Sequence, residues 1–290
     1  MKYKEQREAK ITFQSKDGIT CPVCDTAFFR EELLSGSGRL IAGTLTDELH
    51  RLYEPSAKYG EIFPLAYPAT VCPNCWFTAA DTKDFISFPD TGKNKAADDQ
   101  EKRIQETKMI FPDVDFEKPR DLSAGAASQY LTVRCYDFFP KEFSPTIKQG
   151  LASLRAGWLL EDMDRKLPGQ HYDWLAVLFK KKAQYFYNEA IRREQRGKET
   201  LSGLKVFGPD TDKNYSYEGA LYLSALLTFK YGFQNDSMLR ASALDEAKRT
   251  IARIFGIGKS SKNKPGPLLE HARNLYENLT KELNETDVVQ

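Results

Sequence analysis

Two short motifs hold four of the five cysteines in this chain. They read Cys-Pro-Val-Cys at residues 21–24 and Cys-Pro-Asn-Cys at residues 72–75. Two thiolates separated by two residues can bind one tetrahedral ion from a single tight turn, and two such pairs complete a shell of four sulfur ligands. The proline of each motif fixes φ, and the remaining amides can point at the thiolates. The sequence therefore predicts one metal site, formed by Cys21, Cys24, Cys72 and Cys75.

The donor set favours one structural Zn²⁺ ion. Four cysteines saturate zinc and leave no position open for water or substrate. A redox role needs only one Cys-x-x-Cys pair, normally at the start of a helix in a βαβ context, and neither motif has that setting. An iron centre with the same four ligands stays open, because the sequence does not distinguish the two metals.

The remaining metal-type residues do not extend this site. Cys135 shares the apolar face of a predicted helix with Leu131 and Phe138, so we expect a small buried side chain. The three histidines have no paired spacing, although His50 lies between the motifs and could reach the surroundings of the metal. No phosphate-binding glycine loop and no nucleophile motif occurs, and the sequence favours a protein that is not an enzyme.

The first part of the chain contains short extended segments. Residues 9–14 and 26–30 are predicted strands on either side of the first motif, as in zinc-ribbon-like modules. Residues 39–53 suggest a short strand followed by a helical turn around Leu45, Leu49 and Leu52. Residues 61–71 are expected to be extended and to deliver Cys72, and the polar stretch from residue 90 suggests a linker that runs into a charged helix from about residue 98 to 109. We place a zinc-binding module with its linker at residues 1–115.

The second part of the chain has helical periodicity throughout. Apolar residues recur three or four residues apart in six segments, which begin at Ala127, Leu151, Leu175, Ala220, Leu244 and Leu268. Residues 116–290 therefore form an expected all-α domain of helical hairpins, similar to tetratricopeptide repeats although the repeat pattern is poorly matched. The expected fold class is α+β and mainly α.

Composition excludes several classes of protein. A hydrophobic content of 41% is enough for a core, and a net charge of +1 argues against a general affinity for nucleic acid. No apolar run approaches the length of about 18 residues that suggests a transmembrane helix. Residues 1–10 are polar, so we expect no signal peptide. Cysteines in metal-type spacing favour a reducing compartment, and we expect the cytoplasm.

One basic stretch is a candidate binding surface. Six cations recur along a single long predicted helix, and they are Lys180, Lys181, Lys182, Arg192, Arg193 and Arg196. The simplest interpretation is a solvated helix face. The alternative is a site for an anion, RNA or an acidic partner, and the interleaved Tyr185 and Tyr187 could serve as a stacking surface.

The two cysteine motifs, the aromatic residues behind each, and the helical remainder together resemble a bacterial family, domain of unknown function 2225. Its metal-type cysteines align with Cys21, Cys24, Cys72 and Cys75. The resemblance implies zinc and a helical-repeat C-terminal region, but no established activity. This chain departs from the family pattern by having Trp76 and Phe77 directly after the second motif and a polar insertion from residue 90.

These observations favour a non-enzymatic scaffold. In this hypothesis the zinc module is fused to a tetratricopeptide-like domain that grips another protein in a groove, within a larger bacterial assembly. The alternative is a nucleic-acid-associated zinc-ribbon protein that uses the basic helix 180–196.

Overall fold

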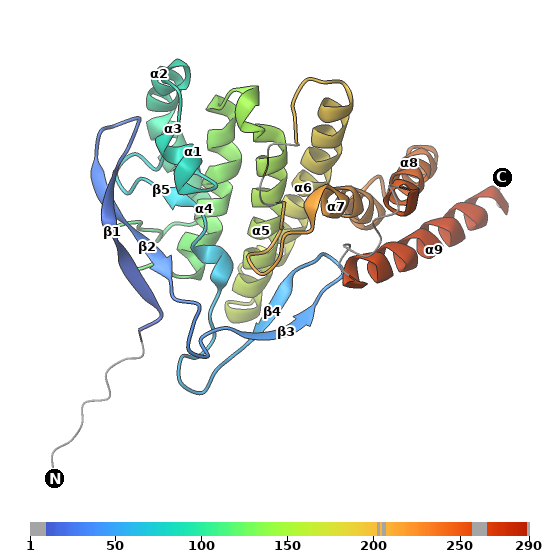
Figure 1. The fold of residues 1–290 in the computed structure, drawn as a ribbon, viewed down its shortest axis with the longest axis horizontal. Coiled ribbons are helices and arrows are strands. Elements are labelled where there is room, and N and C mark those ends of the chain that lie inside the picture. Colours follow the sequence, from blue (N-terminus) through green and yellow to red (C-terminus); the bar gives the residue numbers. More distant parts are fainter. Residues whose placement is uncertain (1–9, 202–203, 205–206, 257–265, 289–290) are drawn as a thin grey trace, which may run out of the picture.

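The computed structural model describes residues 10–201, 204, 207–256 and 266–288. Three two-stranded antiparallel sheets lie in the N-terminal part, and helices make up most of the remainder, as Figure 1 shows. The expected α+β, mainly α fold class is confirmed. Within the described residues, no helix is both long enough and apolar enough to cross a membrane.

Each cysteine motif lies between two paired strands. Strands β1 (Thr12–Thr20) and β2 (Ala27–Leu33) enclose the first motif, and the much shorter β5 (Thr70–Val71) and β6 (Thr78–Ala79) enclose the second. Strand β1 runs through Lys16-Asp17-Gly18. An irregularity in register between Gln14 and Gly18 accommodates these residues within the strand.

The segment between the motifs forms a second hairpin, and the helical turn predicted there is wrong. Strands β3 (Ile41–Leu45) and β4 (Arg51–Glu54) pair antiparallel. Leu45, Leu49 and Leu52 have helical spacing, but Leu49 has a φ of 61° in the connecting loop, which no helix contains. The Thr46 amide donates to the His50 carbonyl at 2.8 Å and closes that loop.

Three helices follow the second motif, and the expected linker is partly wrong. Helices α1 (Thr82–Ile86), α2 (Asp90–Asp98) and α3 (Gln100–Ile110) occupy this region. The polar stretch from residue 90 is helical, and it buries Gly92 and Ala96. Gly92 allows α2 to approach the Phe88 ring and the Phe138 carbonyl closely. A Cβ at residue 92 would lie only 2.5 Å and 2.8 Å from them. The predicted charged helix is confirmed as α3.

The six periodic segments are confirmed as helices. They are α4 (Leu122–Cys135), α5 (Pro145–Lys166), α6 (Tyr172–Gln195), α7 (Ser216–Tyr231), α8 (Ser237–Gly256) and α9 (Gly266–Val288). Each of these helices contacts the next one along the chain. Short 3₁₀ turns η1 (Pro64–Ala66), η2 (Tyr136–Phe138) and η3 (Lys141–Phe143) complete the fold.

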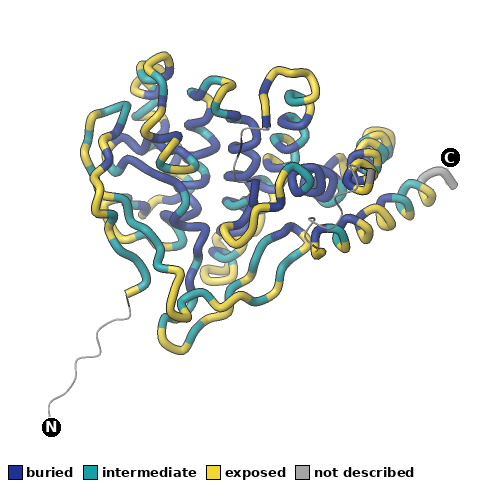
Figure 2. Tube along the Cα trace, viewed as in Figure 1, coloured by how far each residue is buried: buried dark blue, intermediate teal, exposed yellow. Residues whose placement is uncertain are grey.

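One hydrophobic core joins the N-terminal part to the helices. Leu49, Leu65, Val71 and Trp76 belong to the same buried cluster as the inward faces of α4 to α9. Figure 2 shows this buried interior along the central helices, with exposed residues concentrated at the periphery. The boundary at residue 115 stays a prediction, and the core extends across it.

A buried carboxylate anchors the tip of the β3–β4 hairpin. Glu48 is only 4% exposed. Its oxygens accept hydrogen bonds from Trp158 Nε1 at 2.6 Å and from the Tyr231 hydroxyl at 2.8 Å. The ammonium groups of Lys180 and Lys230 each lie 3.2 Å from the same carboxylate. The loop is therefore bound to α5, α6 and α7 at once.

The charge of Glu48 is well compensated. Burial alone raises the pKa of a carboxyl group, but Lys180, Lys230 and the two hydrogen bonds outweigh it and lower the pKa of Glu48 from 4.5 to about 2. The ionised form is therefore favoured in the folded protein. The resulting stability is present above a pH of about 4.5 and is lost as the pH falls towards 2.

We expect Glu48→Gln to destabilise the protein by about 3 kcal/mol at neutral pH, since that is the free energy of such a pKa difference. Thermal and urea unfolding between pH 7 and 3 measure this effect. The variant should lack the part of the acid destabilisation that Glu48 causes in the wild type. Asp47→Asn is the control, because Asp47 contacts Lys230 from a half-exposed position and should cost less than about 1 kcal/mol. Equal losses in the two variants would contradict the assignment.

Candidate metal centre

The two cysteine loops repeat one backbone pattern. The Cys21 amide donates to the Thr26 carbonyl at 2.9 Å, and the Cys72 amide donates to the Phe77 carbonyl at 2.9 Å. The chain then bends back with a positive φ at the residue after each second cysteine, 57° at Asp25 and 58° at Trp76. Each loop is therefore a tight knuckle that turns both of its thiols to the same side.

A second hydrogen bond closes each knuckle. The Asp25 amide donates to the Cys21 carbonyl, and the Trp76 amide donates to the Cys72 carbonyl, both at 3.0 Å. The matching strands on either side, β1–β2 and β5–β6, hold the two knuckles in equivalent settings. The repeated motif in the sequence is therefore a repeated structure.

The four sulfur atoms form one compact cluster. The Sγ atoms of Cys21 and Cys75 lie 3.6 Å apart, as do those of Cys24 and Cys72. All four Sγ atoms lie within 4.8 Å of one another. Sulfur ligands at about 2.3 Å from a tetrahedral ion are separated by about 3.8 Å from each other. The spacing therefore fits one metal ion, and the structure brings together the four residues predicted to bind it.

Burial protects the cluster from solvent. The side chains of Cys21, Cys72 and Cys75 are 0% exposed. Cys24 is partly exposed, and its thiol lies 3.2 Å from Thr26 Oγ1. Asn74 Nδ2 donates to Cys24 Sγ at 3.6 Å and to Thr26 Oγ1 at 3.1 Å. The second knuckle thus covers the one exposed thiol of the first.

The protons of the cluster are strongly coupled. Hydrogen bonds with Cys21 and then Cys75 lower the pKa of the Cys72 thiol to about 2. The pKa of Cys21 is raised to about 12, first by its hydrogen bond with Cys72. That of Cys75 is raised by hydrogen bonds with Cys21 and Cys72 and by burial. Four thiolates can coexist here only with a compensating positive charge, which a metal ion supplies while the thiol protons are released.

Backbone amides assist the thiolates, as the motif predicts. The Val23 amide lowers the pKa of Cys21, and the amides of Asn74 and Cys75 lower that of Cys72. These donors belong to the knuckles themselves, so the turn that spaces the sulfurs also stabilises their charge.

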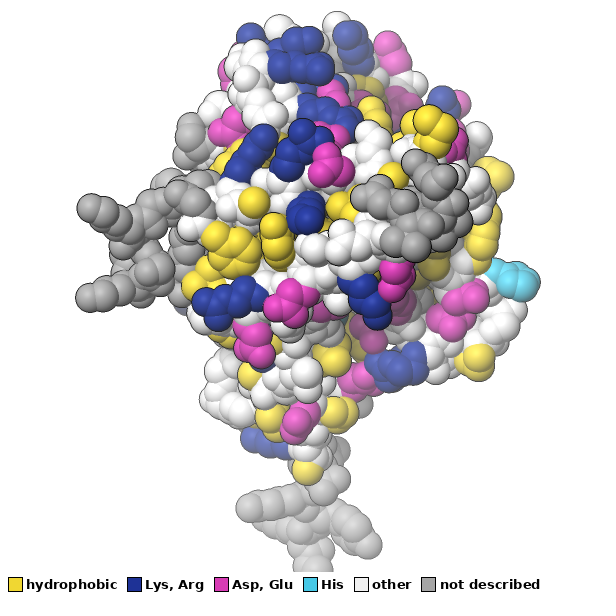
Figure 3. All heavy atoms as spheres, turned by 90° about the vertical axis from the view of Figure 1, so that its right-hand side faces the viewer, with side chains coloured by type: hydrophobic (Ala, Val, Ile, Leu, Met, Phe, Trp, Pro, Cys, Tyr) yellow, Lys and Arg dark blue, Asp and Glu magenta, His cyan; other side chains and the backbone are white. Residues whose placement is uncertain are grey.

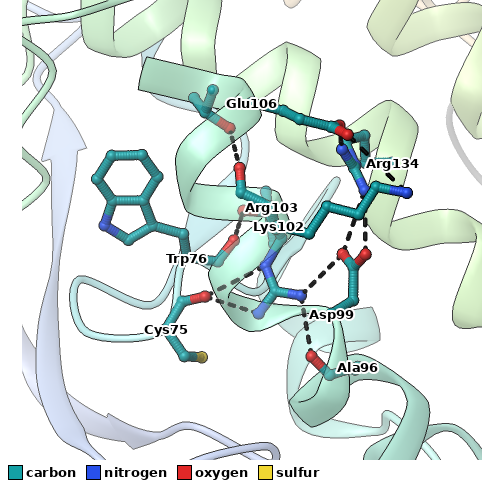
Figure 4. Close-up of polar contacts among 10 residues, drawn as sticks. Cys75, Trp76, Ala96, Asp99, Lys102, Arg103, Glu106 and Arg134 are labelled. Carbon is teal, nitrogen blue, oxygen red and sulfur yellow. Dashed lines mark hydrogen bonds and ion pairs between the residues drawn. The ribbon is translucent and has the colours of Figure 1, made fainter. Parts of the chain in front are cut away.

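A buried arginine holds the second knuckle from behind. Arg103 of α3 is 0% exposed, and its Nε and Nη2 atoms donate to the Cys75 carbonyl at 3.2 Å and 2.7 Å. Figure 4 shows the guanidinium group facing this carbonyl. Its Nη1 donates to the Ala96 carbonyl at 2.9 Å and lies 3.4 Å from Asp99 Oδ2. Arg103 therefore ties the knuckle to α2 and α3.

Asp99 extends this contact to the helical part. Its carboxylate accepts from Arg134 of α4 at 3.1 Å, and Arg134 also pairs with Glu106. Sequence analysis did not identify Arg103. The only signal is that α3 lacks an apolar stripe, so that its buried positions are the polar Arg103 and Thr107.

Cys135 and His50 lie outside the cluster of four sulfur atoms. Cys135 is buried, as predicted, and belongs to the hydrophobic cluster around the knuckles. Burial raises the pKa of its thiol to about 11. His50 Nδ1 lies 2.5 Å from Asp210 Oδ2, and its ring stacks on Trp158. It therefore belongs to a different site.

The structure separates the six predicted basic residues. Lys180 is buried and pairs with Glu48 and Glu161, so it does not contribute to a surface patch. The other five lie at or near the surface of α6 and its C-terminal end: Lys181, Lys182, Arg192, Arg193 and Arg196. Two of these are paired, Arg192 with Glu246 at 3.5 Å and Arg193 with Glu189 at 2.8 Å.

Comparison with known proteins identifies the family. The model described as "Uncharacterized protein conserved in bacteria (DUF2225)" matches residues 14–279. The chain belongs to this family. An uncharacterized protein of Borreliella burgdorferi (strain ATCC 35210 / DSM 4680 / CIP 102532 / B31) is 41% identical to this DUF2225 protein over 277 residues. The match covers 94% of this chain and 98% of the relative. No solved structure matches the chain.

We expect Cys72→Ser to abolish metal binding, because three thiolates no longer fill the tetrahedral shell. Elemental analysis of the purified protein should give about one metal ion per chain for the wild type and less than about 0.2 for the variant. Cys135→Ala removes a buried thiol outside the cluster and should retain the metal. Full metal content in Cys72→Ser would show that the cluster is not the binding site.

We expect Arg103→Met to weaken metal binding by about 10- to 100-fold, because the Cys75 carbonyl loses both donors and the knuckle loses its support. Competition with a chromogenic chelator measures this affinity. Arg134→Met is the matched control, since Arg134 contacts Asp99 and Glu106 but not the knuckle. If both variants bound metal equally well, the proposed role of Arg103 in supporting the knuckle would be wrong.

Proposed function

We propose that this DUF2225 protein is a non-enzymatic scaffold that binds another protein through its helical part, with a structural zinc ion in the cysteine cluster. The four thiols support the second half of the proposal, because a shell of four sulfurs leaves zinc no position for catalysis. Iron has the same ligand preference, so metal analysis that found iron in stoichiometric amount would refute zinc.

A groove between α6, α7 and α8 carries the proposal for partner binding. It encloses a volume of about 460 Å³. Polar side chains line it, namely Gln184, Asn188, Gln195, Ser224, Thr228, Ser242 and Thr250. Asn188, Ser224 and Thr228 hydrogen-bond to one another. The exposed Gln195 and Ser242 are the side chains best placed to pair with a peptide backbone. Tyr185 and Phe233, which are 59% and 49% exposed, stand at the groove as apolar contacts. Such a surface suits an extended segment of another protein better than a compact apolar ligand.

The charges of the groove favour an acidic partner. Arg192, Arg249 and Arg253 line it, together with Glu246. Arg192 pairs with Glu246 at 3.5 Å, and Arg249 pairs with Asp245. The exposed Arg253 is therefore the lining cation for which the described residues supply no carboxylate. Figure 3 shows the adjoining face of the molecule, where basic and acidic side chains are interspersed and basic ones gather towards one end. Arg192 was among the residues predicted from sequence, and we assign it here to partner recognition.

The groove lies apart from the helical surface that the protein's own β3–β4 loop covers. The β3–β4 loop fills the space against α5, α6 and α7 through Glu48 and the fully buried Leu49. A tetratricopeptide-like array normally has one concave surface for its partner. We infer that the partner of this protein binds at α6 to α8, because its own hairpin occupies the neighbouring surface.

The alternative of nucleic-acid binding has less support. It requires a row of free cations along α6, whereas Lys180 is buried and two of the arginines pair with carboxylates. The net charge of +1 also argues against nucleic-acid binding. We propose a cytoplasmic location, because a reducing compartment keeps cysteine ligands available for a metal.

A pull-down from the source cell tests partner binding. We expect the wild type to retain a specific protein, and Ser242→Arg to lose it by about tenfold or more, because a long side chain at this exposed groove position blocks an extended ligand. Asn278→Arg is the matched control, since Asn278 is exposed on α9 and does not line the groove. Quantitative mass spectrometry of the retained proteins measures the difference.

Two outcomes would contradict the proposal. One is a set of retained proteins that does not differ between Ser242→Arg and Asn278→Arg. The other is tight binding of a fluorescent 20-nucleotide RNA that falls steeply between 50 and 200 mM salt, which would favour the nucleic-acid alternative.

A further inference from the structure

A second cavity lies away from both the cysteine cluster and the α6–α8 groove. It has a volume of about 250 Å³ and is bounded by β4, by the segment around η1 and by the C-terminal half of α5. Its apolar walls are Leu52, Ile62, Phe63, Pro64, Leu65 and Leu159. Polar groups from His50, Asp162 and Arg165 also line it. Apolar walls with a few polar groups are typical of small-molecule sites.

His50 is held rigidly at this cavity. Its Nδ1 faces Asp210 Oδ2 at 2.5 Å, and Asp210 has a side chain that is 0% exposed. The Arg51 amide donates to the same oxygen at 2.8 Å. The imidazole ring stacks on Trp158 with centroids 4.2 Å apart and an interplanar angle of 9°. These contacts fix the ring, so its other nitrogen has a defined direction.

That nitrogen is available to a ligand. Burial raises the pKa of Asp210, but the hydrogen bond with His50 and the backbone amides outweigh it, and the net shift is downward. The carboxylate is therefore ionised, and in the neutral ring the proton lies on Nδ1 and leaves Nε2 as an acceptor. Among the described residues, Nε2 has no hydrogen-bond partner.

Asp162 supplies a second acceptor in the same cavity. Its Oδ1 accepts from Arg165 at 2.8 Å, and in the described part of the chain its Oδ2 has no partner. Arg165 also binds Glu61 at 2.5 Å, so this one cation is shared between two carboxylates.

The charged side chains that line the cavity are evenly matched, with Glu61 and Asp162 against Arg51 and Arg165. Both cations are already engaged by carboxylates. In the described part of the chain, the lining groups left without a partner are the acceptors His50 Nε2 and Asp162 Oδ2. These free acceptors favour a ligand that donates hydrogen bonds and carries a positive charge.

We propose that this cavity binds a small organic amine, whose ammonium group meets His50 Nε2 and the Asp162 carboxylate and whose apolar body packs on Phe63, Leu65 and Leu159. The volume of about 250 Å³ lies below the range of about 300 to 1,000 Å³ that is usual for drug-sized ligands, so the ligand is compact. The site is independent of the proposed partner groove, which lies at α6 to α8.

Binding can be followed in the full-length, metal-loaded protein through the indole N–H signal of Trp158, whose ring lines the cavity. The probes share a phenyl body and differ in the head group: phenethylamine, 2-phenylethanol and 3-phenylpropionate. We expect phenethylamine to shift the Trp158 signal saturably at millimolar concentration. The neutral alcohol should bind about tenfold more weakly, and the acid more weakly still. The exposed Trp174 should not respond.

Two variants test whether the amine binds in this cavity. Asp162→Asn should weaken phenethylamine binding about tenfold and remove its advantage over 2-phenylethanol, because one charged acceptor is lost. Asp164→Asn, on the same helix but outside the cavity, should bind as the wild type does. Leu52→Arg places a cation at a half-exposed wall position and should abolish amine binding without depending on Asp162.

The proposal is overturned if no probe shifts the Trp158 signal, or if 3-phenylpropionate binds as tightly as phenethylamine. It is also overturned if both Asp162→Asn and Leu52→Arg bind phenethylamine with the affinity of Asp164→Asn. None of these outcomes affects the partner groove, which is tested separately.

Discussion

The closeness of four sulfur atoms is the constraint on which the N-terminal part depends. Thiols within 4.8 Å of one another repel once ionised, and burial makes each charge more costly. A bound cation turns that repulsion into attraction and joins two knuckles that are far apart in the sequence. The paired strands beside the second knuckle are only two residues each, and such short pairs are not stable alone. A metal ion bound at the four cysteines would therefore supply the order that these elements lack.

Two buried charged groups then connect this part to the helices. Arg103 holds the Cys75 carbonyl and, through Asp99, reaches α4. Glu48 brings the β3–β4 loop against α5, α6 and α7. Each charge is fully paired, and removal of one partner would leave the other buried without compensation. Both contacts specify one arrangement of the N-terminal part on the helices, since few alternative positions satisfy every donor and acceptor.

The sequence predicted the features that are coded locally. Spacing within each motif identified the four cysteines that the structure brings together, and helical periodicity located α4 to α9. The helical turn predicted from Leu45, Leu49 and Leu52 was wrong, because their spacing also fits a hairpin. Leu49 is buried in the loop of that hairpin. Helix α2 was missed because its sequence is polar and contains Gly92, and the close packing of that glycine against Phe88 and Phe138 is visible only in the fold. The burial of Lys180 and the roles of Arg103 and His50 depend on partners distant in the chain, Glu48, Cys75 and Asp210, which no local pattern reveals.

The β3–β4 hairpin lies within the chain segment that the two knuckles enclose, and its tip is bound to the helices. Closing such a segment at the metal removes conformational entropy that an open segment would retain. Metal binding at the cysteines would therefore lower the entropic cost of docking the hairpin, and docking would in turn bring the two knuckles together. The two events are thermodynamically linked, so metal affinity and the rigidity of α5 to α7 should rise and fall together. Through this linkage the availability of a metal ion would act on a helical surface that contains no metal ligand.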